Sequence, residues 1–135
     1  MAKVSVLVDT DIFIDYFNTQ RFRSLFDPQQ FTVYYSIATK KELLSKPGLR
    51  ENERQTIIAE LGRCRIIALD DVIAIKYSEL QHRYPALHKE DALIAASALV
   101  KNLPLLTQNW KHFKEILGLS FFPVGKQPTI KRKRR

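Results

Sequence analysis

The sequence predicts an α/β domain built on a five-stranded parallel β-sheet. Five short runs rich in β-branched, aromatic or leucine residues alternate with stretches whose apolar residues recur at helical spacing. The first run, Val4 to Val8, is apolar apart from Ser5, which is typical of a strand buried on both faces of a parallel sheet. A length of 135 residues favours a single domain with a sizeable core.

The predicted elements follow one another in regular order. Strands are expected at residues 4–8, 31–35, 64–69, 103–106 and 119–124. Helices are expected at residues 11–18, 37–45, 51–61, 70–84, 88–101 and 110–117, with a short additional helix within 19–27. Several of these helices stop at residues that interrupt helical structure, namely Pro28, Pro47, Gly62 and Pro85.

The net charge of +8 is concentrated at the C-terminal end. Six cations and no acids lie from Lys126 onward, which leaves 16 cations against 14 acids in the rest of the chain. We therefore expect a globular domain over residues 1–125 and a basic tail over residues 126–135. Such a tail serves either as a solubilising end or as a binding segment for nucleic acid phosphates, here through Lys131, Arg132, Lys133 and Arg134.

Several absences narrow the class of protein. No apolar run approaches the roughly 20 residues that a membrane-spanning helix needs, and the first residues lack the architecture of a signal peptide. The single cysteine, Cys64, has no partner for an internal disulfide. We expect a cytoplasmic protein without membrane contacts, in which Cys64 is a small buried residue.

Four polar residues occupy corresponding places in the predicted units. Asp9 directly follows the first strand, and Asn109 follows the fourth. Glu42 lies about two turns into the helix after the second strand, and Asp91 lies in the first turn of an alanine-rich helix. Because the carboxyl ends of parallel strands meet at one edge of a sheet, these side chains are expected to converge there.

Converging carboxylates repel each other unless a cation neutralises them. An all-oxygen site of this kind suits Mg²⁺ or Mn²⁺, which converts bound water into a nucleophile and stabilises charge on a phosphoryl oxygen. Together with the basic tail, the pattern indicates metal-dependent cleavage of a nucleic acid. For Asp9 and its neighbour Asp11, capping of the helix that follows is the simpler alternative.

Four stretches of the chain carry a family resemblance. They are residues 7–16 (Leu-Val-Asp-Thr-Asp-Ile-Phe-Ile-Asp-Tyr), 35–43, 90–98 and 106–113 (Leu-Thr-Gln-Asn-Trp-Lys-His-Phe). In this order the sequence resembles the PIN-domain ribonucleases, and specifically the VapC-type toxins of bacterial toxin–antitoxin pairs. The similarity extends from residue 4 to about residue 124.

The resemblance implies a three-layer α/β/α fold and a Mg²⁺- or Mn²⁺-dependent endoribonuclease. It implies that Asp9, Glu42 and Asp91 hold the metal, so that a metal-activated water attacks the RNA phosphodiester. Family members often carry a fourth acid where this chain has Asn109, so one negative charge is missing here. Three hydroxyl residues are implied as hydrogen-bond partners of the metal ligands: Thr10, Thr107 and, as a weaker candidate, Ser36.

The resemblance also implies an RNA substrate, a cognate antitoxin and a homodimer. Lys40 and Lys41 flank Glu42 and are expected to contact RNA phosphates, although a solvated helix face explains them equally well. The alternative function is a degenerate PIN module that binds RNA or a protein partner without cutting. Phosphatases with an Asp-x-Asp motif are disfavoured, because the chain is short and lacks their later lysine and Gly-Asp motifs.

Overall fold

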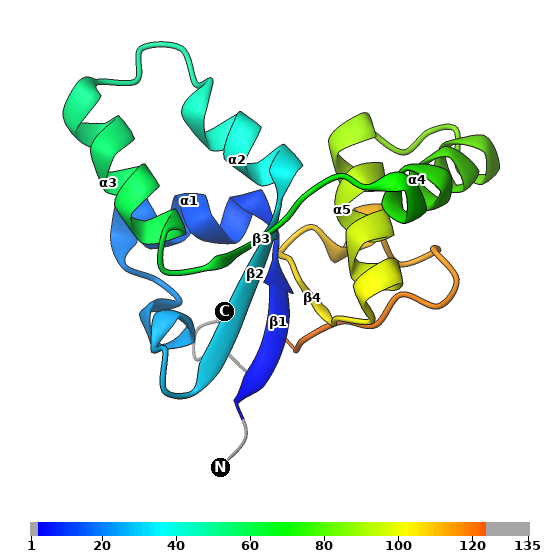
Figure 1. Cartoon of the computed structure of the whole chain (residues 1–135), viewed down its shortest axis with the longest axis horizontal. Coiled ribbons are helices and arrows are strands. Elements are labelled where there is room, and N and C mark those ends of the chain that lie inside the picture. The colour runs from blue at the N-terminus through cyan, green and yellow to red at the C-terminus, as the bar shows by residue number, and fades with distance from the viewer. Residues whose placement is uncertain (1–2, 124–135) are drawn as a thin grey trace, which may run out of the picture.

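The computed structural model describes residues 3–123 and shows a parallel sheet with helices on both of its faces (Figure 1). The domain boundary expected at residue 125 and the basic tail, including Lys131, Arg132, Lys133 and Arg134, lie outside the described residues. The elements in chain order are β1 (Val4–Val8), α1 (Thr10–Thr19), η1 (Arg23–Phe26), β2 (Phe31–Ser36), α2 (Ile37–Leu44), α3 (Glu51–Leu61), β3 (Arg65–Ile67), α4 (Asp71–Arg83), α5 (Lys89–Lys101), β4 (Leu105–Leu106) and η2 (Trp110–His112).

The strands lie in the order β3-β2-β1-β4, and every pair is parallel. β1 is therefore an inner strand, with β2 on one side and β4 on the other. The chain passes from β1 to β2 and β3 in one direction, whereas β4 is added on the opposite side. Ligands of open parallel sheets bind where the strand order reverses in this way, which points to the carboxyl end of β1.

Alternate side chains of β1 enter two different hydrophobic cores. Val6 and Val8 pack in one core with α1 residues such as Phe13, whereas Leu7 packs in the other with α5 residues such as Ile94. Accordingly, Figure 1 shows α1, α2 and α3 on one side of the sheet and α4 and α5 on the other. The predicted three-layer α/β/α arrangement follows from this double burial.

The prediction of five strands is not confirmed. Within residues 3–123 the sheet has four strands, and the expected fifth strand makes a single parallel bridge between Phe121 and Leu105. Two backbone hydrogen bonds fix this bridge, from Leu105 N–H to Ser120 and from Phe122 N–H to Leu105. Because β4 has only two residues, it offers little edge for a longer pairing, and Pro123 has no N–H to continue it.

The prediction of a helix at residues 110–117 is wrong. Only Trp110–His112 forms a short 3₁₀ turn, followed by further turns. Successive bonds from Phe113 N–H to Trp110 and from Ile116 N–H to Phe113 span three residues, so the segment winds tightly. Phe113 and Ile116 are both buried, and their spacing of three anchors this winding to the core.

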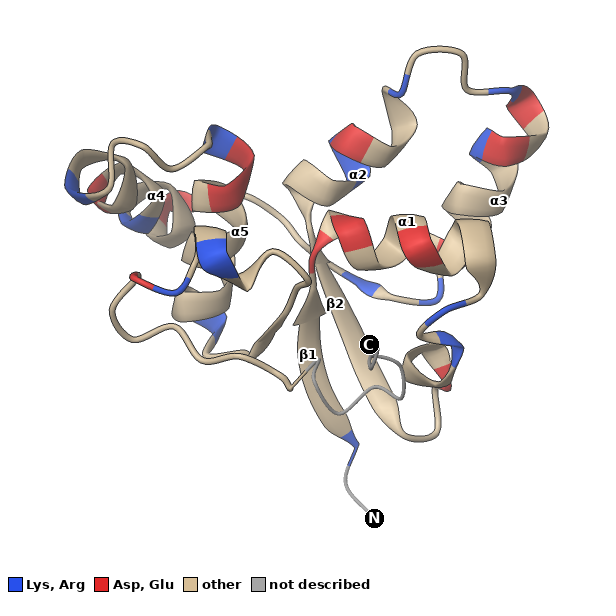
Figure 2. Ribbon diagram, turned by 180° about the vertical axis from the view of Figure 1, so that it is seen from behind, with Lys and Arg blue, Asp and Glu red and all other residues tan. Residues whose placement is uncertain are grey.

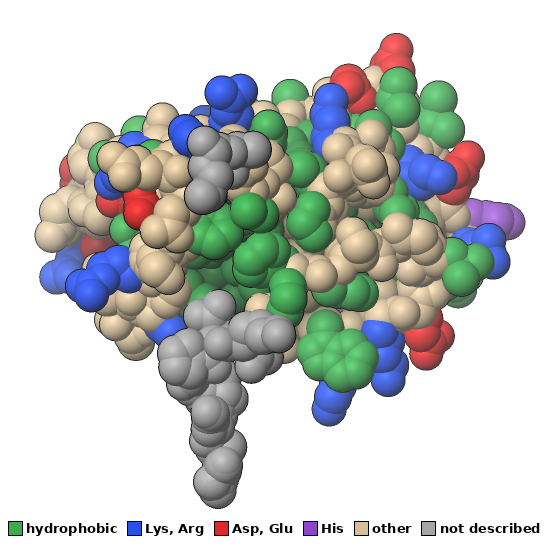
Figure 3. Space-filling model, turned by 90° about the horizontal axis from the view of Figure 1, so that it is seen from below, with side chains coloured by type: hydrophobic (Ala, Val, Ile, Leu, Met, Phe, Trp, Pro, Cys, Tyr) green, Lys and Arg blue, Asp and Glu red, His purple; other side chains and the backbone are tan. Residues whose placement is uncertain are grey.

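The two edges of the sheet differ in character. Figure 3 views the molecule from the end of the sheet where the strands begin. This face has hydrophobic side chains in its middle and scattered Lys and Arg side chains around them. The acidic residues that the sequence singled out belong to the opposite edge, where the strands end. Among residues 3–123, no helix combines the length and apolar character needed to cross a bilayer.

Candidate active site

Asp9 sits at the junction between β1 and α1 and is only 5% exposed. Its backbone N–H bonds to Leu106 of β4, which fixes its position at the end of the sheet. One carboxylate oxygen, Oδ1, accepts a 2.7 Å hydrogen bond from the N–H of Thr10 and caps α1. The other, Oδ2, accepts a 2.7 Å hydrogen bond from the hydroxyl of Thr107, which follows β4.

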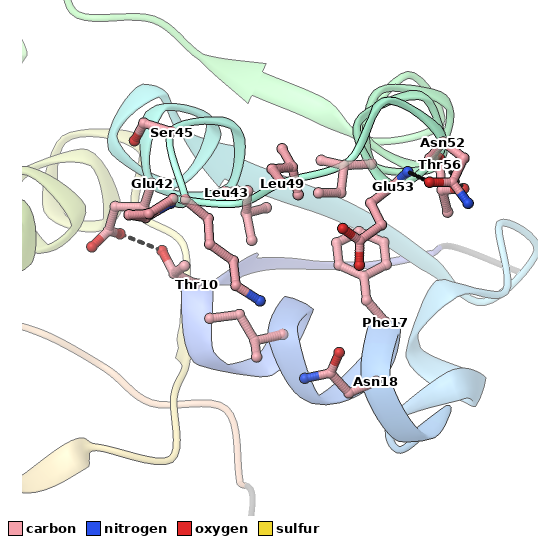
Figure 4. A pocket seen from close by; sticks show the side chains of 14 residues that line it. Thr10, Phe17, Asn18, Glu42, Leu43, Ser45, Leu49, Asn52, Glu53 and Thr56 are labelled. Carbon is pink, nitrogen blue, oxygen red and sulfur yellow. Dashed lines mark hydrogen bonds between the residues drawn. The ribbon is translucent and has the colours of Figure 1, made fainter.

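Glu42 is joined to this junction through Thr10. The Thr10 hydroxyl donates a 2.6 Å hydrogen bond to Oε1 of Glu42, as the dashed line in Figure 4 shows. The same hydroxyl lies 2.9 Å from that of Thr39. Because a hydroxyl carries one proton, Thr39 donates to Thr10 while Thr10 donates to Glu42. This chain of bonds holds α2 against the start of α1 and orients Glu42.

Asp91 approaches from the other layer of helices, in the first turn of α5. Its Oδ2 lies 3.5 Å from Nδ1 of His112, the last residue of the 3₁₀ turn after β4. Figure 2 shows acidic positions on α1, on α2 and at the start of α5 arranged around the carboxyl end of β1. The sheet topology thus brings acids from distant parts of the chain to the same end of the sheet.

The pKa values of Asp9 and Asp91 are raised by burial and by repulsion between the acids. Burial raises the pKa of Asp9 above its usual value, and repulsion by Asp91 raises it further. Burial likewise raises the pKa of Asp91, with repulsion by Glu42 opposed by attraction to His112 and His88. Within the described part of the chain, none of the three predicted metal ligands forms an ion pair with a lysine or arginine. Their negative charge is left without a strong cationic partner.

A fourth carboxylate, that of Asp11, lies close to Asp9. We call Asp9, Asp11, Glu42 and Asp91 the acidic cluster. Its Oδ2 accepts hydrogen bonds from the backbone N–H of Gln108, at 3.2 Å, and from the side-chain nitrogen of Asn109, at 3.0 Å. Its Oδ1 is buried without a hydrogen-bond partner. Burial and repulsion by Asp9 raise the pKa of Asp11 to about 7. In the sequence, the only indication that Asp11 belongs near the site is its position two residues after Asp9. Capping of the following helix explains that position equally well.

The remaining predicted residues fall into three groups. Asn109 lies at the exposed rim of the cluster, where its backbone N–H bonds to the Thr107 hydroxyl. Ser36 is fully buried and caps α2, because its hydroxyl oxygen accepts a 3.0 Å hydrogen bond from Ala38 N–H. Lys40 and Lys41 are exposed on α2 beside Glu42.

The donor set fits a hard divalent cation in its chemistry. The ligand atoms offered are carboxylate oxygens, and one buried oxygen of Asp11 has no hydrogen-bond partner. Burial and repulsion by neighbouring acids raise the pKa values of Asp9, Asp11 and Asp91. However, no three His, Cys, Asp or Glu side chains of residues 3–123 are grouped closely enough to hold an ion among themselves. Mg²⁺ in proteins keeps several waters and needs only one or two direct carboxylates, which is compatible with this spread.

An apolar groove leads away from Glu42 between α1, α2 and α3 (Figure 4). It has a volume of about 760 Å³, and Thr10 and Glu42 line its end nearest the acidic cluster. Ile14, which is 45% exposed, and Phe17 present apolar surface from α1. We call this feature the apolar groove; its other hydrophobic lining residues are Leu43, Pro47, Leu49 and Ile57.

Comparison with known families decides the class of this fold. The family model described as PIN domain matches residues 6–118. The chain belongs to the PIN-domain family. This PIN domain is 31% identical over 124 residues to Ribonuclease VapC1 of Methanocaldococcus jannaschii, an alignment that covers 87% of this chain and 86% of that protein.

Solved structures of toxin–antitoxin complexes share the fold. VapBC2 from Rickettsia felis, bound to a DNA fragment from its promoter, matches this PIN domain with a TM-score of 0.78 and 25% identity over 88% of this chain and 98% of that one. A toxin–antitoxin complex from Klebsiella pneumoniae matches with a TM-score of 0.71 and 28% identity over 84% of this chain and 94% of that one. The resemblance to VapC-type proteins is confirmed.

Proposed function

We propose that the protein is a metal-dependent endoribonuclease and the toxin of a toxin–antitoxin pair. The observation that carries the proposal is the placement of Asp9, Glu42 and Asp91 around the end of β1, where none of them forms an ion pair with a described lysine or arginine. Burial and repulsion between acids raise the pKa values of Asp9 and Asp91. The similarity to a protein named a ribonuclease supports RNA as the substrate.

The cofactor of this proposal is Mg²⁺ or Mn²⁺, held by Asp9, Glu42 and Asp91 directly or through water. When bound, such an ion supplies a water of lowered pKa and offsets charge on the phosphate. Asp11, whose pKa is raised to about 7, supplies a further carboxyl group beside the position where Asn109 lacks one. The basic groups named from the sequence, Lys40 and Lys41 on α2 and the C-terminal tail, hold RNA phosphates.

The chain's own residues keep the carboxylates in place during the reaction. Thr107 and the N–H of Thr10 each bond one oxygen of Asp9, so this side chain cannot turn away from the end of β1. Thr10 and Thr39 orient Glu42 by the paired hydroxyl contacts. Hydrogen bonds of this kind reduce the reorganisation that a charged ligand needs when it binds a metal.

The proposed protein partner is a cognate antitoxin, as in the toxin–antitoxin complexes that share the fold. The apolar groove supports this partner because it offers exposed apolar surface, including Ile14 of α1. Glu42 lines the same groove, at the end nearest the other acids. A segment bound there would reach the acidic cluster. A basic side chain on such a segment would offset the charge of the carboxylates and block the site.

We further propose that the protein forms a homodimer. Three apolar side chains at the start of α4 and just before it are all more than half exposed: Leu69, Val72 and Ile75. Sedimentation analysis of the purified chain tests this, since a monomer at micromolar concentration would contradict it.

The test of the proposed activity is chelator-reversible RNA cleavage. Purified protein should cut single-stranded RNA when Mn²⁺ or Mg²⁺ is present, lose the activity with EDTA and regain it when metal is returned. Asp9→Asn, Glu42→Gln and Asp91→Asn should each abolish most of the cleavage while the circular dichroism spectrum stays unchanged. Equal cleavage by well-purified Asp9→Asn protein would eliminate the proposal.

The alternative is a PIN module that binds RNA or protein without cutting. The amide of Asn109 at the rim of the cluster favours it, because a carboxylate there would add a negative charge that this chain lacks. RNA binding without cleavage at any concentration of Mn²⁺ would decide for this alternative.

A further inference from the structure

A second hollow adjoins the acidic cluster on the side away from the apolar groove. It has a volume of about 540 Å³ and lies between the connection from α4 to α5 and the segment that begins with η2. Asp91 lies on its wall, so the hollow opens onto the proposed metal site. The other ionisable residues on its wall are mostly basic: Arg83, His88, Lys111 and His112, with Glu115 as the second acid.

Two of these cations are free to bind an anion. Arg83 and Lys111 are exposed, and neither takes part in an ion pair within the described part of the chain. The guanidinium of Arg83 lies 5.8 Å from the centre of the Tyr84 ring, which holds it at the rim of the hollow. Unpaired cations beside the acidic cluster attract the phosphates of a nucleic acid strand and offset the repulsion that the strand meets when it passes the carboxylates.

A hydrogen bond and a buried side chain hold the walls of the hollow together. The backbone N–H of Leu117 donates a 3.2 Å hydrogen bond to the Tyr84 hydroxyl oxygen, which ties the α4–α5 connection to the segment after η2. Phe113 is fully buried, and it anchors the same segment in the core shared with α5. The volume lies within the range of about 300–1,000 Å³ found for small-molecule sites, which is sufficient for a nucleotide.

The apolar groove is much less suited to RNA. Its ionisable lining residues are Glu42, Glu53 and a single cation, Lys46, so it carries an excess of negative charge. An RNA strand there would lose its hydration and gain only one lining cation, Lys46, as a partner for its phosphates. The two hollows that flank the acidic cluster therefore differ in the ligand they favour.

We infer that the hollow lined by Arg83 and Lys111 is a subsite for the RNA nucleotide next to the cleaved bond, with both cations bound to phosphate. The identification of RNA as the ligand rests on the proposed function. In this arrangement the strand enters along the α4–α5 connection, passes Asp91 and does not occupy the apolar groove. RNA and an apolar protein segment approach the acids from opposite sides.

The test is RNA binding by full-length protein carrying Asp9→Asn, which prevents cleavage. Fluorescence anisotropy with a short labelled single-stranded RNA is measured over a series of salt concentrations. The test variant adds Arg83→Glu and Lys111→Glu. Its control adds Lys3→Glu and Lys101→Glu, two exposed lysines before β1 and at the far end of α5, so that the net charge changes equally.

The test pair should raise the Kd for RNA about tenfold or more and lower the slope of log K against log salt by about 1.4, the value for two lost contacts to single-stranded phosphates. The control pair should change the Kd less than about threefold, because non-specific attraction alone is affected. Equal effects of the two pairs, or unchanged binding in both, would overturn the subsite. If wild-type protein binds RNA through this hollow but does not cleave it with Mn²⁺, the proposed activity fails and the subsite stands.

Discussion

The side-chain nitrogen of Asn109 lies 3.0 Å from Oδ2 of Asp11 and joins the segment after β4 to the first turn of α1. Where PIN-domain relatives often carry an acid after the fourth strand, this chain has the amide of Asn109, which donates a hydrogen bond to Asp11 on α1. The cluster keeps four carboxylates, although one of them comes from a position that sequence reasoning did not assign to the site. At this contact the carboxylate belongs to α1 and the neutral amide to the segment after β4.

Exchanging these two residues should reveal their coupling. Asn109→Asp places a second carboxylate against Asp11, whose pKa is already about 7, and removes a donor. We expect a loss on the order of 1–3 kcal/mol in the free energy of unfolding at about pH 8 without metal. The double variant Asp11→Asn with Asn109→Asp restores a donor–acceptor pair and should recover most of this loss.

Urea unfolding of both single variants and the double variant in EDTA provides the measurement. The double-variant cycle should give a coupling energy of about 1 kcal/mol or more, because the residues are in direct contact. Additive effects of the two substitutions would show that the contact has no energetic weight.

The stability of the metal-free protein should fall as the pH rises. The pKa of Asp11 is about 7 in the folded state against an ordinary value of 3.8, so the native state holds this proton more tightly than the unfolded state. Between these values the unfolded state binds fewer protons, and the free energy of unfolding decreases with pH by an amount on the order of 2–4 kcal/mol. The raised pKa values of Asp9 and Asp91 act in the same direction.

Unfolding experiments between about pH 4 and pH 8 in EDTA measure this dependence. Asp11→Asn should flatten the curve, and Asp27→Asn, at an acid away from the cluster, should leave its shape unchanged. Stability that increases across this range in wild-type protein would contradict the charge arrangement.

Thr107 should matter through Asp9 rather than through packing alone. Thr107→Val keeps the shape of the side chain but removes the 2.7 Å hydrogen bond to Asp9 and leaves a buried carboxylate oxygen without a partner. We expect a loss of about 1–3 kcal/mol in stability and about 10–100-fold in RNA cleavage or metal affinity. Thr107→Ser, which keeps the hydroxyl, should retain most of both. Equal activity of the valine and serine variants would remove Thr107 from the site.

The apolar groove can be tested separately from catalysis. Ile14→Glu introduces a charge into its exposed apolar wall, whereas Ile58→Glu places the same charge on the outer face of α3. We expect only Ile14→Glu to weaken co-purification with an antitoxin encoded beside this protein, by about tenfold or more, because a buried glutamate has no partner there. RNA cleavage by both variants should stay near the wild-type rate. Equal antitoxin binding by the two variants would contradict this use of the groove.

Local patterns predicted the elements that have a strong apolar period. The β-branched run of β1 and the alanine-rich α5 lie where the sequence places them, since both face the cores directly. The segment after Asn109 was predicted as a helix, and its buried residues Phe113 and Ile116 recur at a spacing of three. That spacing serves a 3₁₀ turn as well, and only the tertiary contacts of these side chains decide between them.

The positions of the candidate site residues could be predicted to the extent that the sheet topology decides them. A parallel sheet brings residues after β1 and β4 together, so the proximity of Asp9, Thr107 and Asn109 follows from the strand order. The position of Asp11 depends on which way the first turn of α1 faces, and a single sequence does not reveal this orientation. The distinct character of the two flanking hollows likewise depends on side chains that meet only in the folded chain.

The central claim is that Asp9, Glu42 and Asp91 form one acidic pocket whose repulsion a divalent cation relieves. Titration of Mn²⁺ into metal-free protein, followed by calorimetry, tests it without any assumption about the substrate. We predict saturable binding by wild-type protein and at least about tenfold weaker binding by Asp9→Asn, Glu42→Gln and Asp91→Asn individually. Identical Mn²⁺ affinity in wild-type protein and all three variants, or no binding by wild-type protein, would contradict the claim.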